Sequence, residues 1–98
     1  MIAQTWRGWT ASDIADEYAA FLREVALREY GSIPGNRGAY AFRRPSADGV
    51  EFLTLSVWES LGAVPLPANG DRARGFYPED SRHLVGRQSI ASRWEIVK

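Results

Sequence analysis

Few side chains in this sequence could take part directly in a reaction, and they differ in the chemistry that they offer. His83 is the single histidine, and histidine is the residue type that most readily gains and loses a proton near neutral pH. Tyr77 carries a hydroxyl that could hold a substrate oxygen, and Arg7 or Arg93 could stabilise a negative charge that develops there. These residue types predict proton transfer beside an anion-stabilising group.

Aromatic side chains could bind a flat ring beside these groups. Trp6, Tyr40 and Trp58 are candidates for stacking or hydrogen bonding with such a ring, together with Tyr77. A structural role is open for each, because large aromatic residues on strands usually pack in a core or an interface. The two arginines could equally pair with a neighbouring strand or a second subunit, and His83 follows polar residues that are typical of a surface.

The composition excludes several kinds of site and partner. The chain has 98 residues, of which 45% are hydrophobic and 24% charged, so we expect one folded domain over residues 1–98. Because it has no cysteine and one histidine, we expect no disulfide, no metal site and no bound cofactor. A formal net charge of +0 disfavours nucleic acid and anionic membranes as partners.

The same reasoning gives an expected location. No apolar run approaches the ~20 residues that are needed to cross a bilayer. The first residues also lack the basic and apolar regions of a signal peptide. We therefore expect a cytoplasmic protein that has no contact with a membrane.

The elements that must position these residues follow in the order β-α-β-β-α-β. Apolar and alternating runs predict strands over residues 1–7, 37–44, 51–58 and 88–97. Thr10 is predicted as the N-cap of a first helix that ends at Gly31, and Asp48-Gly49 indicates a hairpin. A short second helix is predicted from Tyr77 to Gly86. The apolar face of the first helix is predicted to contain Ile14, Tyr18, Phe21, Leu22 and Val25.

This order is that of the α+β ferredoxin-like split β-α-β-β-α-β, in which helices cover one face of a four-stranded antiparallel sheet. Both alternating sets of strand residues are apolar, so both faces of the sheet should be covered. We therefore expect a homodimer whose two sheets pack together; the alternative is that the second face is partly wet. The two sets are Trp6, Tyr40, Phe42, Phe52, Trp58 and Trp94, and Ala3, Thr5, Ala39, Ala41, Leu53, Leu55, Val57 and Ala91.

The segment after the third predicted strand begins as a helix and is then interrupted. Ser60 is a good N-cap, but Pro65 and Pro67 remove backbone donors soon afterwards. A stiff, irregular loop up to Gly75 is the expected result. Two interpretations stay open: a lid over a pocket between sheet and helices, or a degraded helix without a function.

Several stretches resemble the antibiotic biosynthesis monooxygenase-like family, and together they cover nearly the whole chain. They are TWRGWT at 5–10, PGNRG at 34–38, VEFLTLSVWESL at 50–61, FYPED at 76–80 and WEIV at 94–97. The resemblance implies a dimeric α/β barrel of two ferredoxin-like subunits. It also implies a possible activity, which is oxygenation of a hydroxyaromatic, polyketide-type compound without a cofactor.

That chemistry asks the protein to bind a flat ring, to hold a deprotonated substrate and to exclude water while the anion reduces oxygen. Within this resemblance, the catalytic candidates are Tyr77, His83 and Arg7. The candidates for binding the aromatic substrate are Trp6, Tyr40, Trp58 and Arg93.

Three other functions were weighed against this one. A non-catalytic dimeric barrel that binds a ligand or serves as an accessory protein is the open alternative. Haem degradation, known from a branch of the same family, is disfavoured because the first strand has no asparagine and the positions of its tryptophan and histidine fall near Pro67 and Tyr77. RNA binding is disfavoured because the run from Arg37 to Phe42 lies on the second strand and has Ala39 where an aromatic residue is required.

Overall fold

The computed structural model of this chain describes residues 1–64, 83–88 and 91–98. The chain begins with a long strand, continues through one helix and a β-hairpin, and ends with two short strands. The elements are β1 (Ile2–Thr10), a 3-10 turn (Ser12–Ile14), α1 (Ala15–Phe21), a π-helical turn (Leu22–Ala26), α2 (Leu27–Gly31), β2 (Asn36–Ser46), β3 (Gly49–Trp58), a 3-10 turn (Leu61–Ala63), β4 (Leu84–Arg87) and β5 (Ser92–Glu95).

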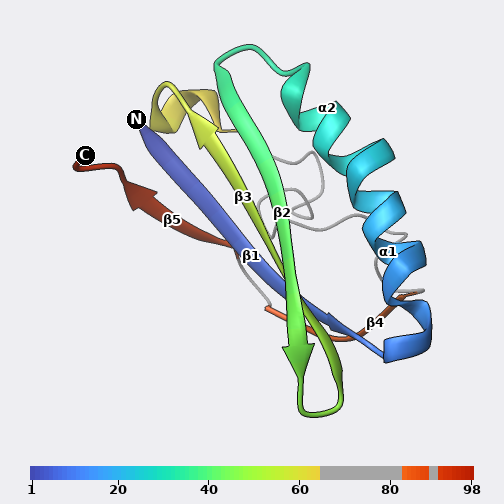
Figure 1. Cartoon of the computed structure of the whole chain (residues 1–98). Helices are drawn as coiled ribbons and strands as arrows, with labels where there is room; N and C mark the ends of the chain where they lie inside the picture. Colours follow the sequence, from blue (N-terminus) through green and yellow to red (C-terminus); the bar gives the residue numbers. More distant parts are fainter. Residues whose placement is uncertain (65–82, 89–90) are drawn as a thin grey trace.

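The strands form one antiparallel sheet in the order β2-β3-β1-β4, and β5 also pairs with β1. The continuous helix made by α1, the π-helical turn and α2 lies along one face of this sheet (Figure 1). The two chain ends lie close together, and Ile96 donates its N–H to the Met1 carbonyl at 2.9 Å. This α+β arrangement is compatible with the ferredoxin-like fold that the sequence predicts.

The last part of the chain differs from the prediction. The predicted helix end at Gly86 is wrong, because Gly86 belongs to β4 and lies opposite Trp9. The predicted last strand over 88–97 is confirmed only over Ser92–Glu95, which is β5, and a further strand that was not predicted, β4, pairs with the other half of β1. Pro65, Pro67 and most of the predicted second helix lie outside the described residues.

Gln88 lies where the edge of the sheet is interrupted. Its backbone N–H donates to the Arg7 carbonyl at 2.8 Å, and its side-chain Oε1 accepts from the Arg7 N–H at 3.2 Å. The Gln88 carbonyl in turn accepts from the Trp6 indole at 3.0 Å. The Gln88 amide and the Trp6 indole therefore make hydrogen bonds that backbone groups would make in a regular strand pair. Such irregular pairing is common at sheet edges.

The predicted N-cap at Thr10 is wrong, because β1 continues through Gly8, Trp9 and Thr10. Ala11 precedes the 3-10 turn instead, without a side-chain cap. The hairpin predicted at Asp48-Gly49 is present, and Ser46 pairs with Gly49. A Cβ at Gly49 would lie 2.0 Å from the Thr10 carbonyl oxygen, so this close approach of two backbones requires glycine.

The helix buries a different set of residues from the predicted one. Val25, predicted on the apolar face, is 45% exposed, whereas Ala26 is buried. The π-helical turn explains the change, since its wider turn rotates the following residues relative to an α-helix. From Tyr18 onward the buried positions therefore recur every four residues, at Tyr18, Leu22, Ala26 and Tyr30.

Two clusters of buried side chains join the helix to the sheet. The first is built around Tyr18 and Phe52, whose rings meet edge to face at 4.9 Å between centroids. The second is built around Tyr30 and Trp58, whose rings meet edge to face at 6.1 Å. Such contacts add to the stabilisation from apolar burial, so the helix is fixed to the sheet at both of its ends.

The predicted division of strand residues between the two faces is wrong. Trp6, Phe52 and Trp58 are buried on the helix side, whereas Tyr40, Phe42 and Trp94 are more than half exposed. The reason is the register: Tyr40 lies opposite Leu55, and Trp94 lies opposite Ala3. Even-numbered residues of β2 and β5 therefore share a face with odd-numbered residues of β1 and β3. We call this face the open face; it carries Ala3, Thr5, Arg7, Trp9, Tyr40, Phe42, Arg44, Glu51, Leu53, Leu55, Val57 and Trp94.

Candidate functional site

The predicted site residues do not lie in one place. His83, Trp6, Trp58 and Arg93 lie on the helix side of the sheet, and Arg7 and Tyr40 lie on the open face. Tyr77 lies outside the described residues, so its role stays a prediction. On the helix side, His83 lies at the Thr10 end of β1, whereas Trp58 lies opposite Ile2 at the other end, so these two residues do not share one site.

His83 lies directly before β4 and contacts the helix. Its Nε2 is 3.0 Å from Glu17 Oε2, and only 11% of the His83 side chain is exposed. Its ring stacks on Phe21 at 6.1 Å between centroids and lies tilted against Tyr18 at 5.5 Å. The surface position typical of its sequence neighbours is therefore not what the structure shows.

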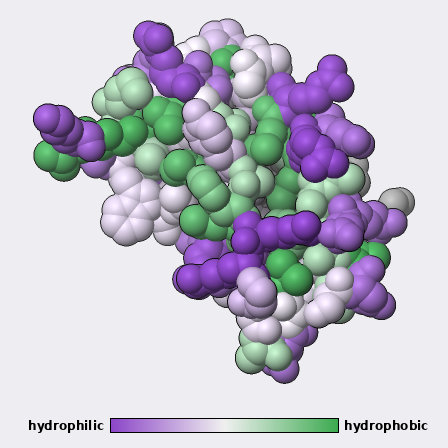
Figure 2. All heavy atoms as spheres, viewed as in Figure 1, coloured by the Kyte–Doolittle hydropathy of each residue, from purple (hydrophilic) through white to green (hydrophobic). Residues whose placement is uncertain are grey.

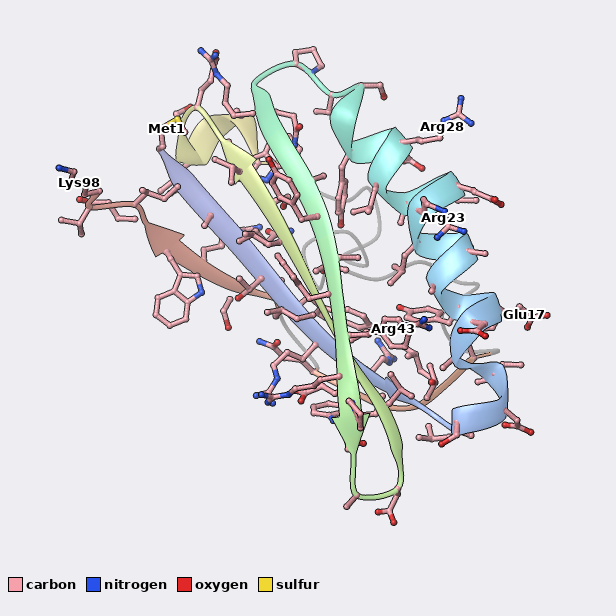
Figure 3. The ribbon with its side chains drawn as sticks, in the orientation of Figure 1. Met1, Glu17, Arg23, Arg28, Arg43 and Lys98 are labelled. Atoms are coloured by element: carbon pink, nitrogen blue, oxygen red, sulfur yellow. The ribbon has the colours of Figure 1, made fainter. Side chains whose placement is uncertain are left out.

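A histidine held by a carboxylate can act as a general base. The carboxylate fixes the orientation of the imidazole and stabilises the imidazolium that forms when a proton is taken up. Glu17 reaches His83 from α1, and its own side chain is 67% exposed. Figure 3 labels Glu17 on the helix, where it lies one turn from Phe21.

Thr10 adds a buried hydroxyl on the same side. It pairs with Leu84, the residue that follows His83, and it is 1% exposed. In the described part of the chain, Thr10 Oγ1 has no hydrogen-bond partner. Buried polar atoms are nearly always hydrogen-bonded, so this hydroxyl is an exception among the described residues.

The two tryptophans on the helix side have satisfied indole groups. Trp58 is fully buried and donates to Ser56 Oγ at 2.9 Å. Trp6 donates to the Gln88 carbonyl at 3.0 Å. Both are core residues with satisfied indole groups, so their predicted part in binding an aromatic ring stays a prediction.

Arg93 also has a structural partner, as the sequence allowed. Its Nε donates to Oε1 of Gln4 at 3.1 Å, and Gln4 is 4% exposed. A guanidinium that satisfies a buried amide oxygen is positioned first of all by that contact. Its part in binding an oxyanion stays a prediction.

The open face carries a cluster of charged residues at Glu51. Arg7 donates to Glu51 Oε2 through Nε at 2.6 Å and also through Nη2, and Arg44 Nε donates to Glu51 Oε1 at 2.7 Å. The Arg7 guanidinium also lies 5.4 Å from the centre of the Trp9 ring, a cation–π contact. Hydrogen bonds from Arg44 and Arg7 lower the pKa of the Glu51 carboxyl below its ordinary value.

A groove of about 440 Å³ lies beside this charged cluster. It is lined by Arg7, Phe42, Arg43, Arg44, Glu51 and Leu53. Tyr40 lies further along the same face, 53% exposed, and does not line the groove. In Figure 2, hydrophobic side chains gather over the middle of the molecule, above a band of hydrophilic ones.

Sequence reasoning missed Glu17, Thr10 and Glu51. Glu17 has the pattern of an exposed helical acid, and Thr10 has that of an N-cap, so neither position carries a signal of its own. Glu51 is an acid at the start of an apolar strand. A charged residue in such a strand is a signal that could have been used, because a buried carboxylate requires partners.

Across residues 1–64, 83–88 and 91–98, no group of three or more His, Cys, Asp or Glu side chains could hold a metal ion. Within those ranges, the structure also contains no helix that is both long and apolar enough to span a membrane.

Comparison of the chain with models of known protein families and with curated proteins finds no match in either. The resemblance to the antibiotic biosynthesis monooxygenase-like family is therefore an expectation from sequence stretches.

Proposed function

We propose that this protein is a homodimeric α/β barrel that binds a small hydroxyaromatic compound between the sheet and the helix and oxygenates it without a cofactor. The observation that carries the proposal is the contact of His83 with Glu17, beside the rings of Tyr18 and Phe21. It supplies a proton acceptor within an aromatic environment. The unpaired Thr10 hydroxyl supports a ligand oxygen nearby.

The proposed reaction begins with proton transfer. His83 takes the proton from the substrate hydroxyl, and Glu17 stabilises the imidazolium. The resulting anion is electron-rich and reduces molecular oxygen directly. For an anthrone-like substrate, a CH₂ group becomes C=O: one oxygen atom enters the product, and the other leaves as water with the two hydrogens of that carbon.

The dimer is supported by the open face. Tyr40, Phe42 and Trp94 are exposed by 53%, 51% and 59%, and Leu53, Leu55 and Val57 lie between them, partly buried. An apolar area of this kind on a small domain indicates an interaction surface. A second copy of the chain would cover it by packing sheet on sheet, with ~2,000 Å² or more buried in total for an obligate dimer.

The proposed activity is tested by oxygen uptake and fluorescence quenching with a panel of anthrone- and naphthol-like compounds. We expect wild-type protein to bind at least one of them and to consume oxygen. His83→Ala should lower turnover roughly 100-fold or more, the usual contribution of a general base, and Glu17→Gln should lower it less. Glu24→Gln, which changes another acid of the same helix, is the matched control and should have no effect.

Two results would contradict this proposal in different ways. Binding without oxygen uptake would support the alternative, a dimeric barrel that only binds its ligand. Uptake that survives both His83→Ala and Glu17→Gln would show that the reaction takes place elsewhere in the protein.

A further inference from the structure

The charged cluster on the open face has more positive than negative charge. Two guanidinium groups, those of Arg7 and Arg44, meet one carboxylate, that of Glu51. The other arginines on β2 have acids of their own: Arg43 pairs with Asp16 on the helix side, and Arg37 pairs with Glu59 near the far end of the strand. Figure 3 shows Arg43 directed towards the helix. Arg7 and Arg44 therefore share a single acid.

Both arginines also keep hydrogen-bond donors for a second anion. A guanidinium has five N–H donors. Glu51 takes up the Nε and Nη2 of Arg7 and only the Nε of Arg44. The Arg44 side chain is 72% exposed and that of Arg7 is 49% exposed, whereas that of Glu51 is 8% exposed. The acid is thus covered, and the remaining donors face the groove and solvent.

Glu51 also holds the two guanidinium groups in fixed places. Each of its oxygens is bound by a different arginine, so the two side chains, which come from β1 and β2, are kept on either side of one carboxylate. An anion that binds between them need not order two long side chains itself, which lowers the entropic cost of binding.

Apolar side chains continue the groove from this charged end. Phe42 and Leu53 are cross-strand neighbours, and both line the groove with Arg7 and Arg44. The volume of about 440 Å³ lies in the range of sites for small organic molecules. One end of the groove suits a negative charge, and the other suits an apolar body.

We propose that this groove binds a small organic carboxylate, with the carboxylate on Arg7 and Arg44 and an apolar or aromatic body on Phe42 and Leu53. Charge-assisted hydrogen bonds to paired guanidinium groups are strong and favour the planar carboxylate over a neutral group. This site lies on the opposite face of the sheet from His83, so the inference does not depend on the proposed oxygenation. Because Phe42 also belongs to the face that a second subunit is proposed to cover, the groove would lie between the two sheets in the dimer.

The test is isothermal titration with 2-naphthoate as the probe and its neutral methyl ester as the comparison compound. Wild-type protein should bind the naphthoate and should bind the ester at least roughly tenfold more weakly, as expected for loss of hydrogen bonds to charged groups. Arg44→Gln should weaken naphthoate binding by a similar factor. Arg37→Gln, an exposed and singly paired arginine of the same strand, is the matched control and should bind as wild type does.

A second variant tests the apolar end of the groove without changing the charged cluster. Phe42→Ala changes a half-exposed side chain and leaves the charged cluster intact, and it should weaken both compounds. His83→Ala should leave naphthoate binding unchanged, which separates this groove from the helix-side site. Absence of naphthoate binding, equal binding of the ester, or loss of binding in Arg37→Gln or His83→Ala would each overturn the proposal.

Discussion

His83 Nε2 lies 3.0 Å from Glu17 Oε2, and this contact joins the start of β4 to α1. The two residues come from elements that are far apart in the sequence, and the sheet pairing of Leu84 with Thr10 places them together. The contact therefore depends on the fold as a whole. It is the reason why the proposed reaction is assigned to the helix side of the sheet.

The unpaired hydroxyl of Thr10 gives a prediction in which stability and binding change in opposite directions. Thr10→Val keeps the shape and removes a buried polar atom without a partner, so the free energy of unfolding should rise by about 1 kcal/mol. Binding of the hydroxyaromatic compound should weaken if Thr10 contacts its oxygen. Urea unfolding and fluorescence titration measure the two effects.

Thr5→Val is the control for this experiment. Thr5 Oγ1 accepts a hydrogen bond from the Trp94 indole at 3.0 Å, so its removal should lower stability, by about 1 kcal/mol or less. If Thr10→Val destabilised the protein as Thr5→Val does, the Thr10 hydroxyl would have a partner in the folded protein.

Glu51 predicts how stability depends on acid. Its pKa is lowered from the ordinary value of 4.5 by Arg44 and Arg7, so the unfolded chain takes up this proton at a higher pH than the folded protein does. The stabilisation is complete above pH 4.5 and is lost as the pH falls through the lowered pKa of the folded protein.

Denaturant unfolding at a series of pH values between neutral pH and pH 3 measures this effect. In Glu51→Gln the contribution is absent, so stability should be lower at neutral pH and should depend less on acid. Glu59→Gln, which removes an exposed single pair with Arg37, should keep the wild-type dependence. If the stability of Glu51→Gln fell with acid as much as that of the wild type, Glu51 would not be the source of the pH dependence.

Gly49 is predicted to be essential for the junction between the hairpin and β1. A Cβ there would lie 2.0 Å from the Thr10 carbonyl oxygen, so Gly49→Ala should destabilise the protein by about 1–3 kcal/mol through overpacking. Gly31→Ala is the control, because nothing lies within 4 Å of a Cβ at that glycine. Thermal unfolding of both variants checks the prediction, and equal stability would contradict the close approach.

The sequence predicts those helices and strands whose signals lie within one short stretch of residues. The helix up to Gly31 and the β2–β3 hairpin are confirmed, because helical spacing and Asp48-Gly49 are local signals. The division of side chains between the faces was wrong, because it is set by the register between strands. A shift of one residue in that register, as in β2 relative to β3, exchanges the faces.

The candidate site was less predictable than the fold. His83 was identified by residue type alone, but its partner Glu17 could not be, since no sequence spacing connects them. Arg7 was predicted to stabilise an anion, but its contact with Glu51 depends on the pairing of β1 with β3 and could not be predicted. Residue type predicts which side chains can do chemistry; tertiary contacts decide which of them meet.

The proposed dimer predicts that a charge on the open face separates the subunits. Leu55 lies between Thr5 and Tyr40 on this face, so Leu55→Arg should give a folded monomer at micromolar concentration, because an unpaired charge at an apolar interface costs several kcal/mol. Val25→Arg changes a half-exposed residue of the helix and should stay dimeric. Analytical ultracentrifugation decides, and a wild-type monomer would exclude the dimer.

The most direct test of the central claim is the fate of oxygen in a single reaction. An anthrone-like compound is mixed with chelator-treated protein under isotopically heavy oxygen gas, and the product is weighed by mass spectrometry against a protein-free blank. We expect one heavy oxygen atom in the new carbonyl, one molecule of oxygen consumed per product, and a rate that falls roughly 100-fold or more in His83→Ala. Product formation no faster than the blank, or at the wild-type rate in His83→Ala, would contradict it.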